Sequence, residues 1–306
     1  MDLPVGESAA LMTAILWTTC SILFASAARR IGALSLNAWR ILMAVCLLGT
    51  AHILLFGTIV PAANQEQYGW LALSGVIGLA IGDFGYFGCL VCMGPRRGVL
   101  LMSMHPIFTA ILAWIWLHEY LSQWTVIGIA MVLTGVIIAI LEQGHVHDEP
   151  ITRDRLMLGG FLGLVGSAGQ GIGIVVAKYG MIEAADPGAA SLDPLSATLI
   201  RMAAACVFVW AAVIVTRNLR SVLKSRKDIH AMKRTFGGAF SGPFLGVWLS
   251  MVAVTYALAG VAATLMSLMP ILIIPVVYVL YKEKTSIRGI MGALVAFIGV
   301  AVLFLM

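Results

Sequence analysis

The chain has 306 residues, of which 61% are hydrophobic and only 11% charged, and its formal net charge is +5. A water-soluble core of this length cannot hide so much apolar surface, so the composition excludes a soluble protein and predicts one that has lipid as its solvent. The positive charge lies mainly in loops between apolar segments, which is typical of membrane topology and not of nucleic-acid binding.

Ten segments of the chain are long and apolar enough to cross a membrane, because a spanning helix needs roughly 20 apolar residues for roughly 30 Å of hydrocarbon. In chain order they lie at about 8–28, 34–56, 68–92, 98–117, 122–141, 156–178, 195–215, 235–257, 261–281 and 286–305. Short turns at 93–97 and 257–261 separate the third span from the fourth and the eighth from the ninth. We therefore expect an all-α membrane protein with ten transmembrane helices.

The distribution of Lys and Arg predicts which loops face the cytoplasm. The first, third, fifth, seventh and ninth loops together hold 16 of the 19 basic residues. Lys178 lies on the opposite face, and Arg40 and Arg201 lie inside spans. We expect these five loops in the cytoplasm and both termini outside.

The second half of the chain repeats the first. With a shift of 164 residues, the sequence matches itself without a gap from about Trp70 to its end. Pro106 then falls on Pro270, and Glu119 falls on Glu283. The protein therefore contains two copies of one hydrophobic unit.

The two copies are expected to have opposite orientations. Upstream of the gapless match, Arg40 pairs with Arg201 at a shift of 161. The chain divides into a first repeat at 1–144, a cytoplasmic linker at 145–155 and a second repeat at 156–306. Because each repeat holds five spans, an odd number, the second enters the membrane upside down. Inverted repeats are the usual frame of a transporter that opens alternately to the two sides.

The motifs of the repeat resemble those of a known family. Arg40 and Arg201 each open the second span of their copy, and a longer pattern occurs twice, first as Pro106…Glu119-x-x-Ser122…Gly128…Gly135-Val136. Over essentially the whole chain this resembles the EamA family of the drug/metabolite transporter superfamily. The resemblance implies a ten-helix bundle of two inverted five-helix repeats around a central cavity, which exports or exchanges small metabolites. In one local departure, His118 and Lys282 stand where the family often has glycine before the motif glutamate.

Three ionisable residues inside spans are predicted to share one depth. At 1.5 Å per residue, Asp83, Arg40 and His105 all lie in the cytoplasmic half of their helices. An ionised carboxylate in hydrocarbon costs at least a few kcal/mol, so Asp83 should face a cavity, pair with a cation or be protonated. Its equivalent in the second copy is Val247, so only the arginine is repeated.

This asymmetry admits two interpretations. In the first, Asp83 binds a proton or a substrate ammonium group, His105 relays the proton or forms a hydrogen bond, and Arg40 tunes the affinity of Asp83 for protons. In the second, Asp83 and Arg40 form a static ion pair and His105 packs between helices. Arg201, like Arg40, is expected to have a structural role because it belongs to the repeated motif.

A second set of residues is predicted at the cavity and the helix ends. Aromatic or polar residues away from the membrane interfaces are candidates for the cavity wall, namely Trp17, Tyr86, Gln170 and Trp248. Pro106 and Pro270 free backbone carbonyls and can kink their helices. Glu119 and Glu283 end spans at helix C-termini, where the helix dipole disfavours an anion, so a local cation or amide partner is expected. Anchoring of the helix end is favoured over a gating role.

The sequence gives no indication of a catalytic centre, cofactor or metal site. His145-x-His147-Asp148-Glu149 has potential metal ligands but belongs to the linker, so we interpret it as a solvated segment. No His-Glu-x-x-His or Gly-x-Ser-x-Gly motif occurs in the chain. An intramembrane enzyme is therefore disfavoured.

We expect a secondary transporter that exports or exchanges a small metabolite, such as an amino acid or related polar solute. It would lie in the lipid bilayer of a bacterial cytoplasmic membrane, use alternating access as a monomer or homodimer, and couple transport to the solute gradient or to protons. The alternative is a flippase or carrier of a lipid-linked or phosphorylated substrate, which requires basic cavity residues. Only Arg40 and Arg201 meet that requirement.

Overall fold

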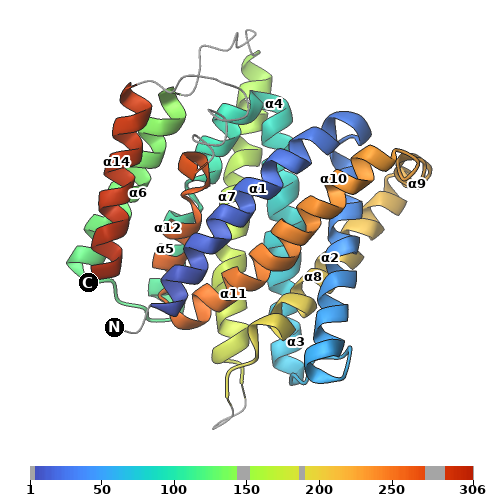
Figure 1. The fold of residues 1–306 in the computed structure, drawn as a ribbon, viewed down its shortest axis with the longest axis horizontal. Helices are drawn as coiled ribbons and strands as arrows, with labels where there is room; N and C mark the ends of the chain where they lie inside the picture. Colours follow the sequence, from blue (N-terminus) through green and yellow to red (C-terminus); the bar gives the residue numbers. More distant parts are fainter. Residues whose placement is uncertain (1–3, 143–151, 186–189, 273–286, 306) are drawn as a thin grey trace.

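The computed structural model describes residues 4–142, 152–185, 190–272 and 287–305. Every regular element in these ranges is a helix, and most helices run along one common direction to form a bundle (Figure 1). Helices satisfy their own backbone hydrogen bonds, which a segment surrounded by lipid must do. The expectation of an all-helical membrane fold is thus met in the part of the chain that the structure describes.

The helices follow the chain in two sets. The first set is α1 (Val5–Ile31), α2 (Ala33–Phe56), α3 (Gln65–Ser74), η1 (Gly75–Gly82), α4 (Asp83–Met102), α5 (His105–Trp116) and α6 (Gln123–Glu142). The second set is α7 (Arg153–Ile182), α8 (Pro194–Val215), α9 (Leu219–Ser225), α10 (Ile229–Ala239), η2 (Phe240–Gly246), α11 (Val247–Tyr256), α12 (Ala259–Met266) and α14 (Ile287–Leu305).

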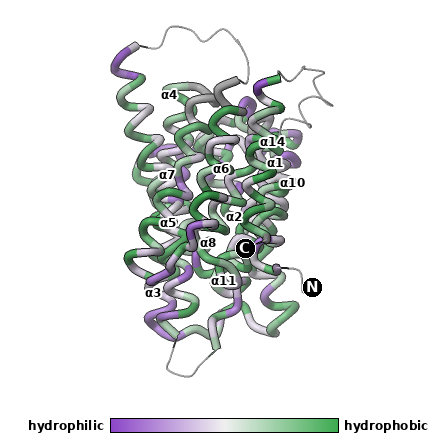
Figure 2. Tube along the Cα trace, turned by 90° about the vertical axis from the view of Figure 1, so that its left-hand side faces the viewer, coloured by the Kyte–Doolittle hydropathy of each residue, from purple (hydrophilic) through white to green (hydrophobic). Residues whose placement is uncertain are grey.

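Eight helical stretches are long and apolar enough to cross a membrane. Two shorter apolar helices, Gln123–Ile138 and Ala259–Leu272, coincide with the predicted fifth and ninth spans. Hydrophobic residues dominate the middle of the bundle, and hydrophilic residues gather toward its two ends (Figure 2). The chain is therefore an integral membrane protein, with eight full-length candidate spans among the described residues.

The chain reverses direction within α4, where the sequence predicts a turn at 93–97. Helical hydrogen bonding continues to Met102. However, a Cβ added at Gly98 would lie only 2.5 Å from Leu90 Cδ2 and 3.5 Å from its Cα. Eight residues of a straight helix span about 12 Å, so the helix folds back between these two residues.

The predicted third and eighth spans differ from uniform α-helices, because each contains a π-helix. η1 ends at Gly82, directly before Asp83, and η2 ends at Gly246, directly before Val247. Asp83 and Val247 are 164 residues apart, so the same irregularity recurs at equivalent places in the two repeats. π-Helical segments are rare and frequently mark functional sites.

The kinks expected at two prolines are full helix breaks that precede them. α4 ends at Met102 and α5 begins at His105, which makes Pro106 the second residue of a new helix. Pro270 likewise follows a break, because α12 ends at Met266 and helical structure resumes at 269–272. Proline is well tolerated in a first turn, where its missing N–H would have no partner within the helix.

The contact between α6 and α14 shows that the repeats are inverted. A Cβ on Gly128 would lie 3.2 Å from the Gly299 carbonyl oxygen, and one on Gly135 would lie 2.4 Å from that of Gly292. The early part of α6 therefore meets the late part of α14, so these equivalent helices are antiparallel (Figure 1). Close approach of glycine backbones is how helices pack in the absence of a hydrophobic driving force.

Candidate functional site

A buried ion pair lies inside the bundle between two spans of the first repeat. Arg40 comes from the second turn of α2, and Asp83 is the first residue of α4. Arg40 Nη2 contacts Asp83 Oδ2, and the two side chains are only 10% and 13% exposed. The attraction between these charges therefore acts in a medium of low dielectric constant.

Gln170 of α7 connects this pair to the second repeat. Its Nε2 donates hydrogen bonds to Asp83 Oδ1 at 2.9 Å and to the carbonyl oxygen of Gly78 at 3.1 Å. Gly78 belongs to η1, so a single amide holds both the carboxylate and the π-helix that precedes it. Gln170, which the sequence predicts at the cavity wall, thus forms a direct hydrogen bond with Asp83.

Arg40 has further partners that fix its guanidinium. Arg40 Nε donates to Asn37 Oδ1 at 2.8 Å, one turn earlier in α2. Its Cζ lies 5.1 Å from the ring centroid of Phe87 and 5.5 Å from that of Phe24. Contacts of a cation with aromatic faces are favourable, and more so when water is excluded.

This arrangement suits a group that exchanges a proton or a cation. Both carboxylate oxygens of Asp83 accept hydrogen bonds, from Arg40 and Gln170 respectively. An ionised carboxylate is an acceptor only, whereas a protonated one carries an O–H donor. Protonation would therefore place the new O–H of Asp83 against an N–H of Arg40 or Gln170. The hydrogen bond that joins α4 to α2 or to α7 would weaken.

His105 does not join this cluster. Its Nδ1 lies 3.0 Å from the Met102 carbonyl oxygen, across the break between α4 and α5. The His105 carbonyl faces Gly171 of α7, where an added Cβ would lie 2.9 Å from it. His105 is buried, and none of its hydrogen bonds among the described residues reaches Asp83. The predicted relay from His105 to Asp83 has no direct contact to support it.

Trp17 and Gln170 each lie against the last glycine of a π-helix in the other repeat. A Cβ added to Gly246 would lie 2.7 Å from the indole Nε1 of Trp17, and one added to Gly82 would lie 3.3 Å from the backbone nitrogen of Gln170. Gly82 and Gly246 end the two π-helices. Each contact joins a helix of one repeat to a π-helix of the other.

Tyr86 and Trp248 are half-buried members of aromatic pairs. The ring centroid of Tyr86 lies 5.6 Å from that of Phe87, and that of Trp248 lies 6.3 Å from that of Phe244. Phe87 also contacts the Arg40 guanidinium, so Tyr86 lies beside the ion-pair cluster. Trp248 packs with the core around α2 and α8.

Glu119 joins three helix ends. Its Oε1 forms an ion pair of 2.6 Å with Lys178 Nζ, and its Oε2 accepts the Ala259 N–H at the start of α12, at 2.7 Å. Lys178 Nζ also donates to the Ala257 carbonyl oxygen, at 2.6 Å. The helix-end argument predicts a cation or an amide partner, and Glu119 has both. His118 before it has a φ of +52°, a conformation that favours glycine.

Arg201 is buried without an acidic partner among the described residues. Its Nη1 donates to the sulfur of Met251 at 2.8 Å, and its Nε has no hydrogen-bond partner within the described ranges. The residue is only 2% exposed. Glu283, the equivalent of Glu119, lies outside the described residues, as does most of the linker at 145–155.

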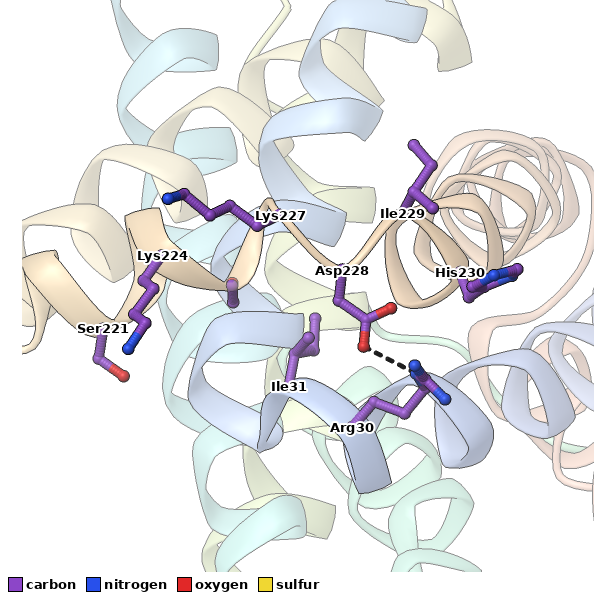
Figure 3. A pocket seen from close by; sticks show the side chains of 9 residues that line it. Arg30, Ile31, Ser221, Lys224, Lys227, Asp228, Ile229 and His230 are labelled. Atoms are coloured by element: carbon purple, nitrogen blue, oxygen red, sulfur yellow. Dashed lines mark hydrogen bonds and ion pairs between the residues drawn. The ribbon is translucent and has the colours of Figure 1, made fainter.

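A pocket of about 650 Å³ opens on the surface between the end of α1, α9 and the start of α10, and its lining includes no residue of the ion-pair cluster (Figure 3). Basic side chains that line it include Arg30, Lys224 and Lys227, and Arg30 Nε forms a 2.8 Å ion pair with Asp228. The hydrogen bond from Arg30, supported by that from the Ala231 N–H, lowers the pKa of the Asp228 carboxyl below its ordinary value. This pair is open to water, in contrast to Arg40 and Asp83.

The sequence-based predictions do not include two residues that bind predicted site residues. Asn37 lies three residues before Arg40, a spacing that places both on one helix face and could have indicated the contact. Lys178 is the one basic residue that the sequence-based topology places on its membrane face, which could have identified it as the partner of Glu119. No group of three His, Cys, Asp or Glu side chains suited to a metal occurs within the described ranges.

Comparisons with known proteins agree with this architecture. A model of the EamA-like transporter family matches residues 4–141 and 157–305. A solved structure titled only "Crystal structure of protein" is similar over 97% of this chain and 96% of its own, with a TM-score of 0.75 and 16% identity. At that identity the likeness concerns the fold alone. A comparison with curated proteins gave no match.

Proposed function

We propose that this chain, which belongs to the EamA-like transporter family, exports or exchanges a small polar metabolite by alternating access. The proposal includes ten spans, with the two shorter apolar helices completing each repeat as its fifth and fourth span respectively. The solute is an amino acid or a related polar molecule, and the carrier lies in a bacterial cytoplasmic membrane with both termini outside.

The observation that carries this proposal is the Asp83 cluster at the contact between the repeats. Arg40 and Asp83 belong to the first repeat, and Gln170 belongs to the second. A buried charge inside a membrane protein is costly and usually marks a pathway for ions or substrates. Its place between two inverted repeats is where a transporter binds its substrate and coupling ion.

Protons couple to transport through Asp83 in this proposal. While Asp83 is ionised, Arg40 and Gln170 hold α2, α4 and α7 together. A proton that enters from one side removes one of these hydrogen bonds and frees the repeats to move. Bare backbone contacts between the repeats assist that movement, because a Cβ added at Gly85 would lie only 2.8 Å from the Gly166 nitrogen.

The test is solute flux in liposomes that contain the purified protein, with and without a pH gradient. Amino acids and related metabolites form the panel, and flux that follows the pH gradient is expected for at least one of them. Asp83→Asn should abolish this coupling because an amide cannot take up the proton. Asp83→Glu, which keeps a titratable group, should retain part of it.

A matched control separates coupling from a general effect of removing a carboxylate. Asp228→Asn makes the same chemical change at the surface ion pair and should leave flux unchanged. Flux of Asp83→Asn equal to the wild type, at equal expression and monodispersity, would reduce Asp83 to a static ion pair. Flux of a lipid-linked or phosphorylated compound in place of soluble solutes would favour the flippase alternative.

A further inference from the structure

The surroundings of Arg201 resemble those of Arg40 but lack its side-chain oxygen acceptors among the described residues. Arg40 and Arg201 are equivalent at a shift of 161, and each contacts the span that follows its π-helix. Arg40 lies against Phe87, and Arg201 donates to Met251, which is the equivalent of Phe87 at a shift of 164. The two guanidinium groups therefore occupy the same place in the two repeats.

The acceptors that satisfy Arg40 have been replaced in the second repeat. Val247 stands where the first repeat has Asp83, and Thr198 stands where it has Asn37. The Thr198 hydroxyl donates instead to the Pro194 carbonyl oxygen at 2.7 Å. As a result, Arg201 Nε has no hydrogen-bond partner in the part of the chain that the structure describes, whereas Arg40 Nε has one.

An arginine in this condition is costly to maintain. A buried cation without a counter-charge destabilises a protein, and a thioether sulfur is only a weak acceptor. The sulfur of Met251 is nevertheless the acceptor of the Arg201 hydrogen bond. Methionine side chains are flexible and adapt their shape, so this partner is easily displaced by a stronger one.

Arg201 also lies at the contact between the two repeats. It belongs to α8 of the second repeat, and its Nη2 would be 3.7 Å from a Cβ added at Gly78 of η1 in the first. The carbonyl of that same glycine accepts from Gln170, which binds Asp83. A rocking motion of the repeats would open the surroundings of Arg201 and of the Asp83 cluster together.

We propose that Arg201 binds a carboxylate of the transported solute, which takes the place that Asp83 fills beside Arg40. The proposal rests on the transport function proposed above and names its substrate class as carboxylic acids, including amino acids. Arg offers a planar pair of donors that matches the two oxygens of a carboxylate. In the structure, the sulfur of Met251 accepts from one of these donors, and the solute carboxylate would take its place.

Binding is tested with acid and amide pairs that differ only in the carboxylate: L-leucine and L-leucinamide, L-phenylalanine and L-phenylalaninamide, and succinate and succinamide. The expected result is that at least one acid raises the unfolding temperature of the purified protein while its amide does not. Arg201→Gln should weaken the apparent affinity for that acid about tenfold to a hundredfold, through loss of a charge-assisted hydrogen bond. Equal effects of acid and amide, or no effect of any acid, would overturn the proposal.

Val247 offers a sharper variant, since Val247→Asp places a carboxylate where Asp83 stands in the first repeat. This tethered anion should occupy Arg201 and abolish the response to acids, whereas the uncharged control Val247→Asn should keep it. Without solute, Val247→Asp should unfold at a higher temperature than Val247→Asn. Arg201→Met should unfold at a temperature no lower than that of the wild type. Loss of stability in Arg201→Met would instead assign Arg201 a structural role.

The outcome is separable from that of the transport proposal. Flux that does not distinguish acids from amides and survives Arg201→Gln would leave a transporter without this subsite. Stabilisation by acids that depends on Arg201, without flux of any of these acids, would support the carboxylate subsite and contradict the transport proposal.

Discussion

The two repeats share a backbone but differ in the side chains around their arginines. Each has a π-helix that ends directly before Asp83 or its equivalent Val247. In the first repeat, Arg40 pairs with the carboxylate that follows the π-helix. In the second, Arg201 has the sulfur of Met251 as its acceptor.

This difference teaches which features the duplicated fold requires. The π-helix and the helix break before Pro106 and Pro270 recur whether or not a carboxylate is present, so they do not depend on the ion pair. The Asp83 cluster is thus a specialisation of one repeat within a shared frame. In the proposed mechanism, this asymmetry assigns the proton to Asp83 of the first repeat and the solute carboxylate to Arg201 of the second.

The largest expected effect comes from removal of the carboxylate that distinguishes the repeats. Asp83→Leu would leave Arg40 buried without a counter-charge, and the free energy of unfolding should fall by about 3–5 kcal/mol. Chemical denaturation of the purified protein in detergent measures this change. The double variant Arg40→Met, Asp83→Leu removes both charges and should recover most of the loss; no recovery would contradict the ion-pair argument.

A second, smaller loss is expected at the Glu119 anchor, which extends the comparison to the helix ends. Glu119→Ala removes the ion pair with Lys178 and the acceptor of the Ala259 N–H, so unfolding should become easier by about 2–3 kcal/mol. Thermal unfolding with a conformational probe detects this. Lys178→Met is the matched variant of the other partner. Unchanged stability in both variants would contradict a role of the Glu119–Lys178 pair in anchoring the helix ends.

The sequence predicts an all-helical membrane fold and the repeat because hydropathy and a fixed shift carry that information directly, and eight of the ten predicted spans have full-length helices among the described residues. It places Arg40 near Asp83 because the two lie at one depth in the membrane. It does not predict the π-helices, because hydropathy does not distinguish them from α-helices; in the structure η1 packs closely on α7 and η2 on α1. Depth along a helix places His105 level with Asp83, but depth says nothing of which side of α7 each residue contacts. Gln170 is recognised as a polar residue in a span, while its bond to Asp83 needs the packed structure.

A moderate effect is expected from crowding the symmetric helix contact. Gly135→Ala would bring a Cβ within 2.4 Å of the Gly292 carbonyl oxygen, and Gly299→Ala would bring one within 2.8 Å of the Val132 nitrogen. Overpacking of this kind costs about 1–3 kcal/mol of stability. Because these glycines are equivalent, similar losses are expected from each, whereas Gly160→Ala, with nothing within 4 Å, should have little effect. A large difference between the first two would break the proposed symmetry of α6 and α14.

The smallest effect belongs to the surface pair of Arg30 and Asp228, which contrasts a solvated ion pair with the buried one. The pKa of Asp228 is lowered in the folded protein, chiefly by its hydrogen bond from Arg30. A carboxyl of this kind stabilises the fold above its unfolded pKa of about 3.9, and the contribution is lost as the pH falls through the folded value. Arg30→Gln should therefore lower the unfolding temperature slightly at neutral pH, and this deficit should disappear once the pH has fallen below the folded-state pKa of Asp228, where the carboxyl is protonated in both proteins. High salt should also reduce the difference, because exposed charges are screened. A deficit that persists unchanged in acid would show that Arg30 acts through packing of its side chain and not through its charge.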